Sequence, residues 1–420
     1  MTKTQIFNDI VSIVKHDAAF CKDECGANAD IYRAQICDSM DDDSFLYTVQ
    51  SYLASFHLTG HLSFQNTARG VLPFRVKRYQ NELYVCKTAL NSPLNIGDKI
   101  IQIDGLSVKE YGEQHVDMLC GESESRQGTC WFRLLTFAKR LTVVRNGETE
   151  VIPVELNGEW ADEDRYSCKH LSDRITYMRL KDFADDVAIV QMYQENDTLL
   201  RSSEYLIIDV RGNNGGNDSA YFPLLEFCLS AGKTAASLEK GPFDSGMEIN
   251  YTERICDSRL KLFEQMLNQD IPADTRRMLT QFTNELRQNR GKGFVPFSSD
   301  EDSSIDLPYV GTTLPKRVFV LTDEECASSG DAFVHDISKC DKVTVVGRPT
   351  MGILDYSNCA GEYYGNFALV YPTSRSLYLD EGIQMSHRGV PVDIYIPWTP
   401  EHCARDVDMD TVLNLIDSGQ

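Results

Sequence analysis

One serine lies at a strand-to-helix turn, where its hydroxyl could act as a nucleophile. The short apolar run that begins at Val318 predicts a buried strand over Arg317–Leu321. The small residues Cys326-Ala-Ser-Ser-Gly-Asp331 follow it, and the spacing after them predicts a helix over 329–339. Such a turn exposes one hydroxyl and aims free backbone N–H groups at the group it attacks, so Ser328 is the candidate nucleophile. The alternative is an Asp/Ser cap on an ordinary helix.

A glycine-rich turn follows the most apolar strand-like run of the chain, Tyr205–Val210. Its sequence is Arg211-Gly-Asn-Asn-Gly-Gly216, which lacks the Lys-Ser/Thr pair of a phosphate-binding loop. Glycines allow close backbone approach, so the N–H of Gly215 or Gly216 could hold a developing oxyanion.

A hydroxyl nucleophile needs a base, and His61 is the candidate. Gly60 ends a helical pattern, and His61 falls where a strand is expected to begin. A single histidine is more often structural than catalytic, so His61 gains interest only beside a nucleophile.

Composition excludes several partners. The chain has 420 residues, 42% hydrophobic and 25% charged, with a net charge of −22. Phosphate backbones bind basic surfaces, so no nucleic-acid partner is expected. No stretch approaches the length of about 20 apolar residues that spans a bilayer, so no membrane partner is expected either.

The thirteen cysteines are scattered. Cys21 and Cys25 lack a second close pair, so no metal site and no cofactor are expected. The N-terminus resembles an amphipathic helix and not a signal peptide. We therefore expect reduced thiols and a cytoplasmic protein; a missing leader would instead mean an exported one.

The pattern predicts four segments. Residues 1–64 are expected to form an N-terminal helical segment, and 65–157 a β-rich module. In 165–400 strands alternate with helices, which predicts an α/β core that includes a strand at 367–371 and is interrupted by a helical insertion at about 233–313. Residues 401–420 are expected to form a C-terminal helix.

Six motifs, in order, resemble peptidase family S41, the tail-specific or C-terminal processing proteases with their tricorn-like and retinoid-binding-protein-like relatives. They cover about 55–397 and are Leu58-Thr-Gly-His-Leu-Ser63, Ser92-Pro93 through Gly105, Leu206–Gly216, Ala327-Ser-Ser-Gly-Asp331, Val346-Gly-Arg-Pro-Thr-Met-Gly352 and Gly389-Val-Pro-Val-Asp-Ile394. The resemblance implies a ClpP/crotonase-like α/β core, a PDZ-like module at 65–157, and serine peptidase activity on unfolded chains or peptide C-termini.

One departure decides between branches of the family. The processing proteases have a Lys general base where this chain has Ile353, which cannot take a proton. The tricorn-like branch uses Ser and His, and His61 matches its histidine. The resemblance therefore implies that Ser328 attacks and His61 accepts its proton, with Ser329 N–H and Gly215 or Gly216 as the oxyanion donors.

The group that orients His61 stays open between two residues. The tricorn-like Glu aligns with Ser386, which could hydrogen-bond an imidazole but cannot balance its charge. Asp355 is a substitute, and its alternative is an Asx turn.

A second function also stays open. Asn91–Asp98 is too short for the helix usual in the family's PDZ-like module, so this module is expected to be degenerate. With the Lys and the Glu both missing, the chain could be a non-catalytic peptide- or ligand-binding protein on the same scaffold. Whether it forms a homo-oligomer is not decided by the sequence.

Overall fold

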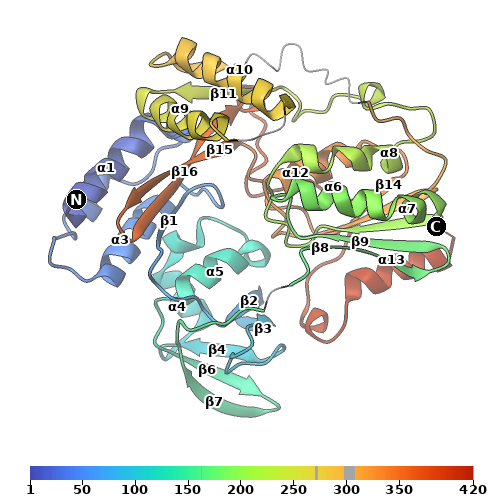
Figure 1. The fold of residues 1–420 in the computed structure, drawn as a ribbon. Coiled ribbons are helices and arrows are strands. Elements are labelled where there is room, and N and C mark those ends of the chain that lie inside the picture. The colour runs from blue at the N-terminus through green and yellow to red at the C-terminus, as the bar shows by residue number, and fades with distance from the viewer. Residues whose placement is uncertain (162, 270–272, 298–307, 420) are drawn as a thin grey trace. The chain divides into compact units, whose positions relative to one another are not determined.

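The structure is a computed structural model of the 420-residue chain, and it describes residues 1–161, 163–269, 273–297 and 308–419 (Figure 1). Residues 270–272 and 298–307 of the predicted insertion therefore lie outside the described residues. The chain divides into two compact units, each described by itself. The first unit comprises 1–68, 240–304 and 355–384, and the second comprises 69–239, 305–354 and 385–420.

The first unit is built on an antiparallel sheet in the order β1-β16-β11-β12, with β15 also paired to β16. Its strands are β1 (Ser63–Asn66), β11 (Met247–Tyr251), β12 (Gly293–Pro296), β15 (Tyr356–Tyr364) and β16 (Phe367–Ser376). Its helices are α1 (Lys3–His16), α2 (Ala29–Arg33), α3 (Asp42–Ala54), α9 (Glu253–Leu267) and α10 (Ala273–Asn289).

Aromatic packing holds α3 on this sheet. The Phe45 ring of α3 meets Phe64 of β1 and Phe367 of β16, with centroids 5.8 and 5.2 Å apart. Phe64 and Phe367 are stacked at 5.4 Å. Elsewhere in the unit, Tyr251, Cys256 and Leu286 join α9 and α10 to β11. These rings bury much apolar area, so they fix which segments of the chain meet.

The second unit contains a five-stranded parallel arrangement, β17-β14-β13-β10-β9, extended by an antiparallel β8. Its strands are β8 (Tyr166–Ser172), β9 (Ile175–Leu180), β10 (Tyr205–Asp209), β13 (Arg317–Thr322), β14 (Val343–Gly347) and β17 (Ile394–Tyr395). Its helices are α6 (Asp186–Glu195), α7 (Asp197–Ser202), α8 (Leu225–Cys228), α12 (Ser329–Ser338) and α13 (Val407–Asp417).

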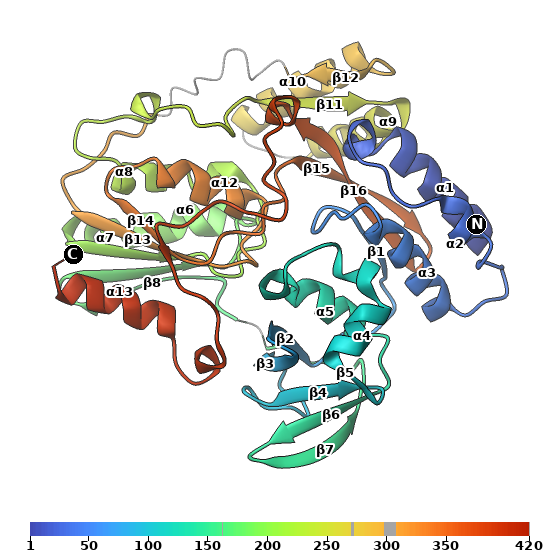
Figure 2. The ribbon, with the colours of Figure 1, turned by 180° about the vertical axis from the view of Figure 1, so that it is seen from behind.

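Helices cover both faces of this sheet, as Figures 1 and 2 show. Val412 and Ile416 of α13 pack with Ile207 and Phe319 on one face. The helices α6 and α12 lie on the other face (Figure 2). A strand covered on both sides is apolar throughout, and all five residues of β10 are buried.

The β-rich module also belongs to the second unit and forms the sheet β2-β3-β4-β6-β7, with β5 paired to β4. Its elements are β2 (Phe74–Tyr79), β3 (Glu82–Thr88), β4 (Lys99–Ile103), β5 (Leu106–Ser107), α4 (Val108–Gln114), the 3-10 helix η3 (Glu124–Arg126), α5 (Gly128–Leu135), β6 (Arg140–Arg145) and β7 (Glu148–Pro153). The PDZ-like assignment of this module stays a prediction.

The mixed α/β class predicted from the sequence is confirmed, since helices and strands alternate along the chain in the second unit. One strand was placed wrongly: 367–371 belongs to β16 and lies in the antiparallel sheet of the first unit, not in the parallel sheet. An apolar run predicts a strand but not the strand that pairs with it, because that pairing depends on segments far away in the sequence. None of the described helices has the length and apolar character that a membrane span requires.

Candidate active site

The backbone of Ser328 is strained in the way expected of a nucleophile at a sharp turn. The parallel strand β13 ends at Thr322 and α12 begins at Ser329, so Ser328 is the last residue before the helix. Its φ is 58° and its ψ −121°, a conformation that residues with a side chain rarely adopt. Such strain costs about 1–3 kcal/mol and is found mostly at functional sites. Ser328 is also the N-cap of α12 and forms a capping box with Asp331, but the backbone of an ordinary N-cap residue is extended and that of Ser328 is not.

The glycine turn packs directly against this serine. A Cβ added to Gly215 would lie 2.6 Å from Ser328 Cβ and 2.9 Å from Ser329 N. At Gly216 it would lie 2.2 Å from the backbone of Phe183. Both positions therefore require glycine for lack of space, and both have a positive φ.

Asn213 holds the two turns together, a role that sequence reasoning missed. It is fully buried, and its backbone O accepts the N–H of Ala327 at 2.8 Å. Its Oδ1 accepts the N–H of Gly215 at 2.8 Å, and its Nδ2 donates to Leu180 O at 2.9 Å. A second link joins the turns where Ser329 Oγ donates to Gly216 O at 2.9 Å. The only sequence signal was that Asn213 precedes the two glycines.

These hydrogen bonds show which of the predicted oxyanion donors already have an acceptor within the protein. The N–H of Gly215 is already donated to Asn213. Within the described ranges, the N–H groups of Gly216 and Ser329 have no protein acceptor. Ser329 is also the first residue of α12, where the helix dipole favours a negative charge.

A buried carboxylate, Asp331, accepts the backbone N–H of Ser328 at 2.7 Å. Burial raises the pKa of Asp331 to about 6, although hydrogen bonds from Thr350, Gly352, Ile353 and Ser328 oppose this rise. Sequence reasoning noted Asp331 only as a capping residue.

A buried group of charges holds the segment just ahead of Ser328. Glu324 accepts from Lys77 Nζ of β2 at 2.7 Å and from Arg348 Nε at 3.0 Å. Arg348 in turn binds Asp408 of α13 at 2.8 Å. Burial alone would raise the pKa of Glu324, but the charges of Lys77 and Arg348 outweigh it and lower the pKa to about 2. The turn that carries Ser328 is thereby joined to the β-rich module and to the C-terminal helix α13.

The β-rich module also contacts turns that follow Ser328 in the chain. Arg126 of η3 donates to the backbone oxygens of Thr350 and Met351 at 3.0 and 2.6 Å. Glu122 Oε1 lies 3.2 Å from His387 Nδ1, and its hydrogen bond raises the pKa of His387. His387 is the neighbour of Ser386, a half-buried residue that the sequence predicts to lie near His61.

His61 belongs to the first unit and lies just before β1. Its Nδ1 is 2.6 Å from the backbone O of Tyr356. A carbonyl oxygen only accepts, so Nδ1 carries the hydrogen and Nε2 is the basic nitrogen. The imidazole is thus oriented by a backbone carbonyl, which lacks the charge of a carboxylate.

The two candidate orienting residues lie in different units. Asp355 is in the first unit, is fully buried, and accepts from Tyr378 OH at 2.9 Å. Ser386 is in the second unit with Ser328, Ser329, Gly215 and Gly216. The pairing of His61 with Ser328, and the roles of Asp355 and Ser386, stay predictions.

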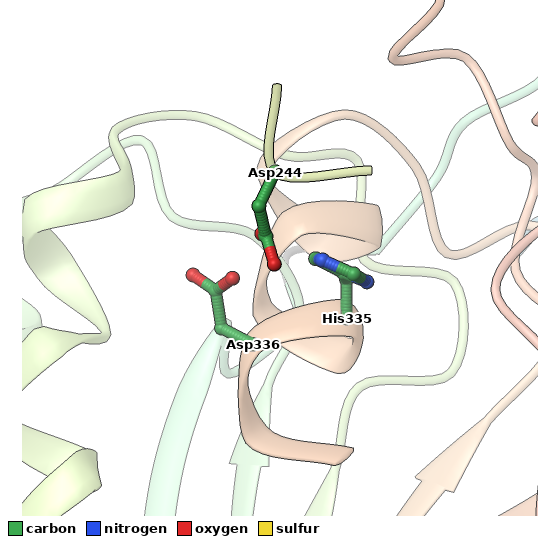
Figure 3. A group of neighbouring side chains, drawn as sticks. All are labelled: Asp244, His335 and Asp336. Carbon is green, nitrogen blue, oxygen red and sulfur yellow. The ribbon is translucent and has the colours of Figure 1, made fainter. Parts of the chain in front are cut away.

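His335 and Asp336 project from neighbouring positions of α12 (Figure 3). Asp336 Oδ2 accepts from Tyr221 OH at 2.8 Å. Asp244, also drawn in Figure 3, belongs to the first unit, so these three side chains are not assigned to one site.

The sequence profile of peptidase family S41 matches residues 174–396, more than half of the chain. Among curated proteins, no match was found. The solved structures similar to this one include mature CPAF, with a TM-score of 0.64, 14% identity, and coverage of 99% of this chain and 97% of that one. Mature CPAF complexed with lactacystin has a TM-score of 0.63, 13% identity and the same coverage. At 14% and 13% identity, the similarity of these structures to this one shows a shared fold alone.

The contact between Gly215 and Ser328 predicts the effect of a single methyl group. G147A is the matched control, because Gly147 has a φ of +84°, close to the +81° of Gly215, but open space at Cβ. G147A should cost only the backbone strain, about 1–2 kcal/mol. G215A should cost about 1–3 kcal/mol more, because its methyl overlaps Ser328. Urea unfolding measures both, and equal losses would contradict the close contact.

The charge group predicts a pH-dependent stability. E324Q leaves Lys77 and Arg348 without their shared carboxylate and should cost about 3–5 kcal/mol at neutral pH. The folded pKa of Glu324 lies below its usual 4.5, so its contribution is present above 4.5 and is lost as pH falls toward 2. The stability difference between wild type and E324Q, measured by urea unfolding, should therefore shrink below about pH 4.

The control for this experiment is E124Q. Glu124 pairs with Arg78, but its side chain is 60% exposed. An exposed pair contributes less than about 1 kcal/mol, so E124Q should change little at either pH. A loss in E124Q as large as that in E324Q would show that burial is not what makes Glu324 important.

Proposed function

Since this chain belongs to peptidase family S41, we propose that it is a serine peptidase that cleaves peptide bonds through a Ser–His acyl-enzyme mechanism. One observation carries the proposal: Ser328 adopts a strained backbone at a strand-to-helix turn packed against Gly215. This conformation is costly, and a capping role would not require it.

In the first step, Ser328 Oγ attacks the carbonyl carbon of the substrate and His61 Nε2 takes its proton. Because Nδ1 carries a hydrogen that it donates to Tyr356 O, Nε2 is the nitrogen that would take that proton. The negative charge on the carbonyl oxygen is held by the N–H groups of Ser329 and Gly216. Gly215 contributes through its missing side chain, because its own N–H is bonded to Asn213.

In the second step, protonated His61 gives its proton to the leaving amine, and the C–N bond breaks. Water then attacks the ester on Ser328, His61 takes a proton from the water, and it returns that proton to Ser328 Oγ as the acid product leaves. Ile353 takes no part, because its side chain is apolar and buried. The substrates are unfolded chains or peptide C-termini, and Asp355 or Ser386 assists His61.

The compartment proposed is the cytoplasm. All thirteen cysteines lie in the described part of the chain and are free thiols. Proteins of oxidising compartments more often pair their cysteines.

A fluorophosphonate probe, which reacts with activated serines, tests the function. Wild type should be labelled at Ser328, as read by mass spectrometry of the labelled peptide, and S328A should not. H61A should be labelled at least about 100-fold more slowly, because loss of a general base costs that much. Lactacystin, which is bound by CPAF in one of the similar structures, should slow the labelling if its site is shared.

S338A is the control for S328A. Ser338 lies at the other end of α12, and its hydroxyl donates to His335 O. It should be labelled like wild type. Folded wild type that is not labelled at Ser328 would instead support a non-catalytic binding protein, a reading favoured by Ile353 and Ser386 at the positions of the missing Lys and Glu. Labelling unchanged in H61A would exclude His61 as the base.

A further inference from the structure

Asp331 makes more hydrogen bonds than a helix cap needs. Its Oδ2 accepts the N–H of Ser328 at 2.7 Å and that of Ile353 at 3.2 Å. Its Oδ1 accepts the N–H of Gly352 at 2.6 Å. A capping residue reaches back to one N–H, so the bonds from Gly352 and Ile353 are not explained by the start of α12. They join the nucleophile turn to a second turn, at 352–353.

The second turn, at 352–353, is closely packed. Gly352 has a φ of +77°, and a Cβ there would lie 2.5 Å from Met385 O and 2.7 Å from Gly389 N. The side chain of Ile353 is buried. Asp331 therefore connects Ser328 to a part of the second unit that is itself closely packed.

Asp331 makes these hydrogen bonds as a buried carboxylate. Burial raises its pKa to about 6, and the N–H groups that it accepts oppose the rise. These donors are the compensation that a fully buried charge requires.

We propose that Asp331 is a positioning residue for Ser328: its carboxylate clamps the strained nucleophile backbone to the turn at 352–353. The inference rests on the proposed role of Ser328 as nucleophile. By accepting the N–H of Ser328, Asp331 leaves the N–H of Ser329 as the donor at this turn that can face an oxyanion. In this chain the 352–353 turn thus supports the nucleophile through its backbone, where the processing proteases resembled by the sequence place a basic side chain.

D331N tests the clamp, because an Asn has nearly the same shape but only one acceptor oxygen, and its NH2 would face backbone N–H donors. D98N is the matched control. Asp98 is also buried in the second unit, and it accepts the N–H of Asn95 at 2.8 Å, far along the chain from Ser328. Two quantities are measured below the unfolding temperature of each variant: the rate of fluorophosphonate labelling at Ser328, and hydrogen–deuterium exchange of peptides covering 326–331 and 350–354.

D331N should be labelled at least about tenfold more slowly than wild type, and both peptides should exchange faster. D98N should lose stability but keep the labelling rate within about twofold and the exchange of both peptides unchanged. Labelling and exchange in D331N equal to wild type would overturn the proposal. An effect of D98N on labelling as large as that of D331N would overturn it as well, since general loss of stability would then be the cause.

Failure of the proposed function is distinguishable. If folded wild type is not labelled at Ser328, the peptidase proposal falls, and exchange alone decides the clamp: faster exchange in D331N supports it, and unchanged exchange overturns it. If D331N does not fold, D331E is measured instead. Glu keeps the carboxylate but lengthens the side chain, so labelling and exchange should fall between those expected of D331N and wild type, and values equal to wild type in both would overturn the proposal.

Discussion

The close approach of two turns, one carrying Ser328 and the other Gly215, is the contact on which the rest of the second unit depends. No side chain fits between them at Gly215, so the serine is held against bare backbone. Asn213 joins the turns through its backbone O, which accepts the N–H of Ala327, while its side chain holds the glycine turn by accepting the N–H of Gly215. Because the interior is close-packed, a displacement of either turn would be felt by the other. The parallel strands β10 and β13, which are paired neighbours, deliver the two turns to the same edge of the sheet.

Buried charges also restrict where the turn that carries Ser328 can lie. Glu324 forms ion pairs with Lys77 of β2 and with Arg348, which follows β14. Arg348 also forms an ion pair with Asp408 of α13. Such groups add little net stability compared with apolar packing, but an incomplete set is strongly destabilising. The arrangement therefore favours one position of the loop over alternatives. Lys77 and Arg126 of the β-rich module therefore help to hold the segments on either side of Ser328.

Much of the second unit could be predicted from the sequence, because its signals are local. Apolar runs gave β9, β10, β13 and β14, and the small residues after β13 indicated the turn at Ser328. Helices α4 and α5 were not predicted, although Ser107 and Glu110 form a capping box at the start of α4. The functions of Asn213 and Asp331, and the carbonyl that orients His61, were missed for a different reason. Each depends on partners that only the folded chain brings close, so no spacing in the sequence records them.

The make-up of the first unit has a consequence for synthesis of the chain. The strand β1, just after His61, pairs with β16, and the imidazole is oriented by the carbonyl of Tyr356. Both partners leave the ribosome hundreds of residues after His61 does, so the nascent polypeptide spends most of translation without the histidine in its final setting. The order of emergence thus means that the imidazole of His61 reaches its final hydrogen-bonded setting only when the chain is nearly complete.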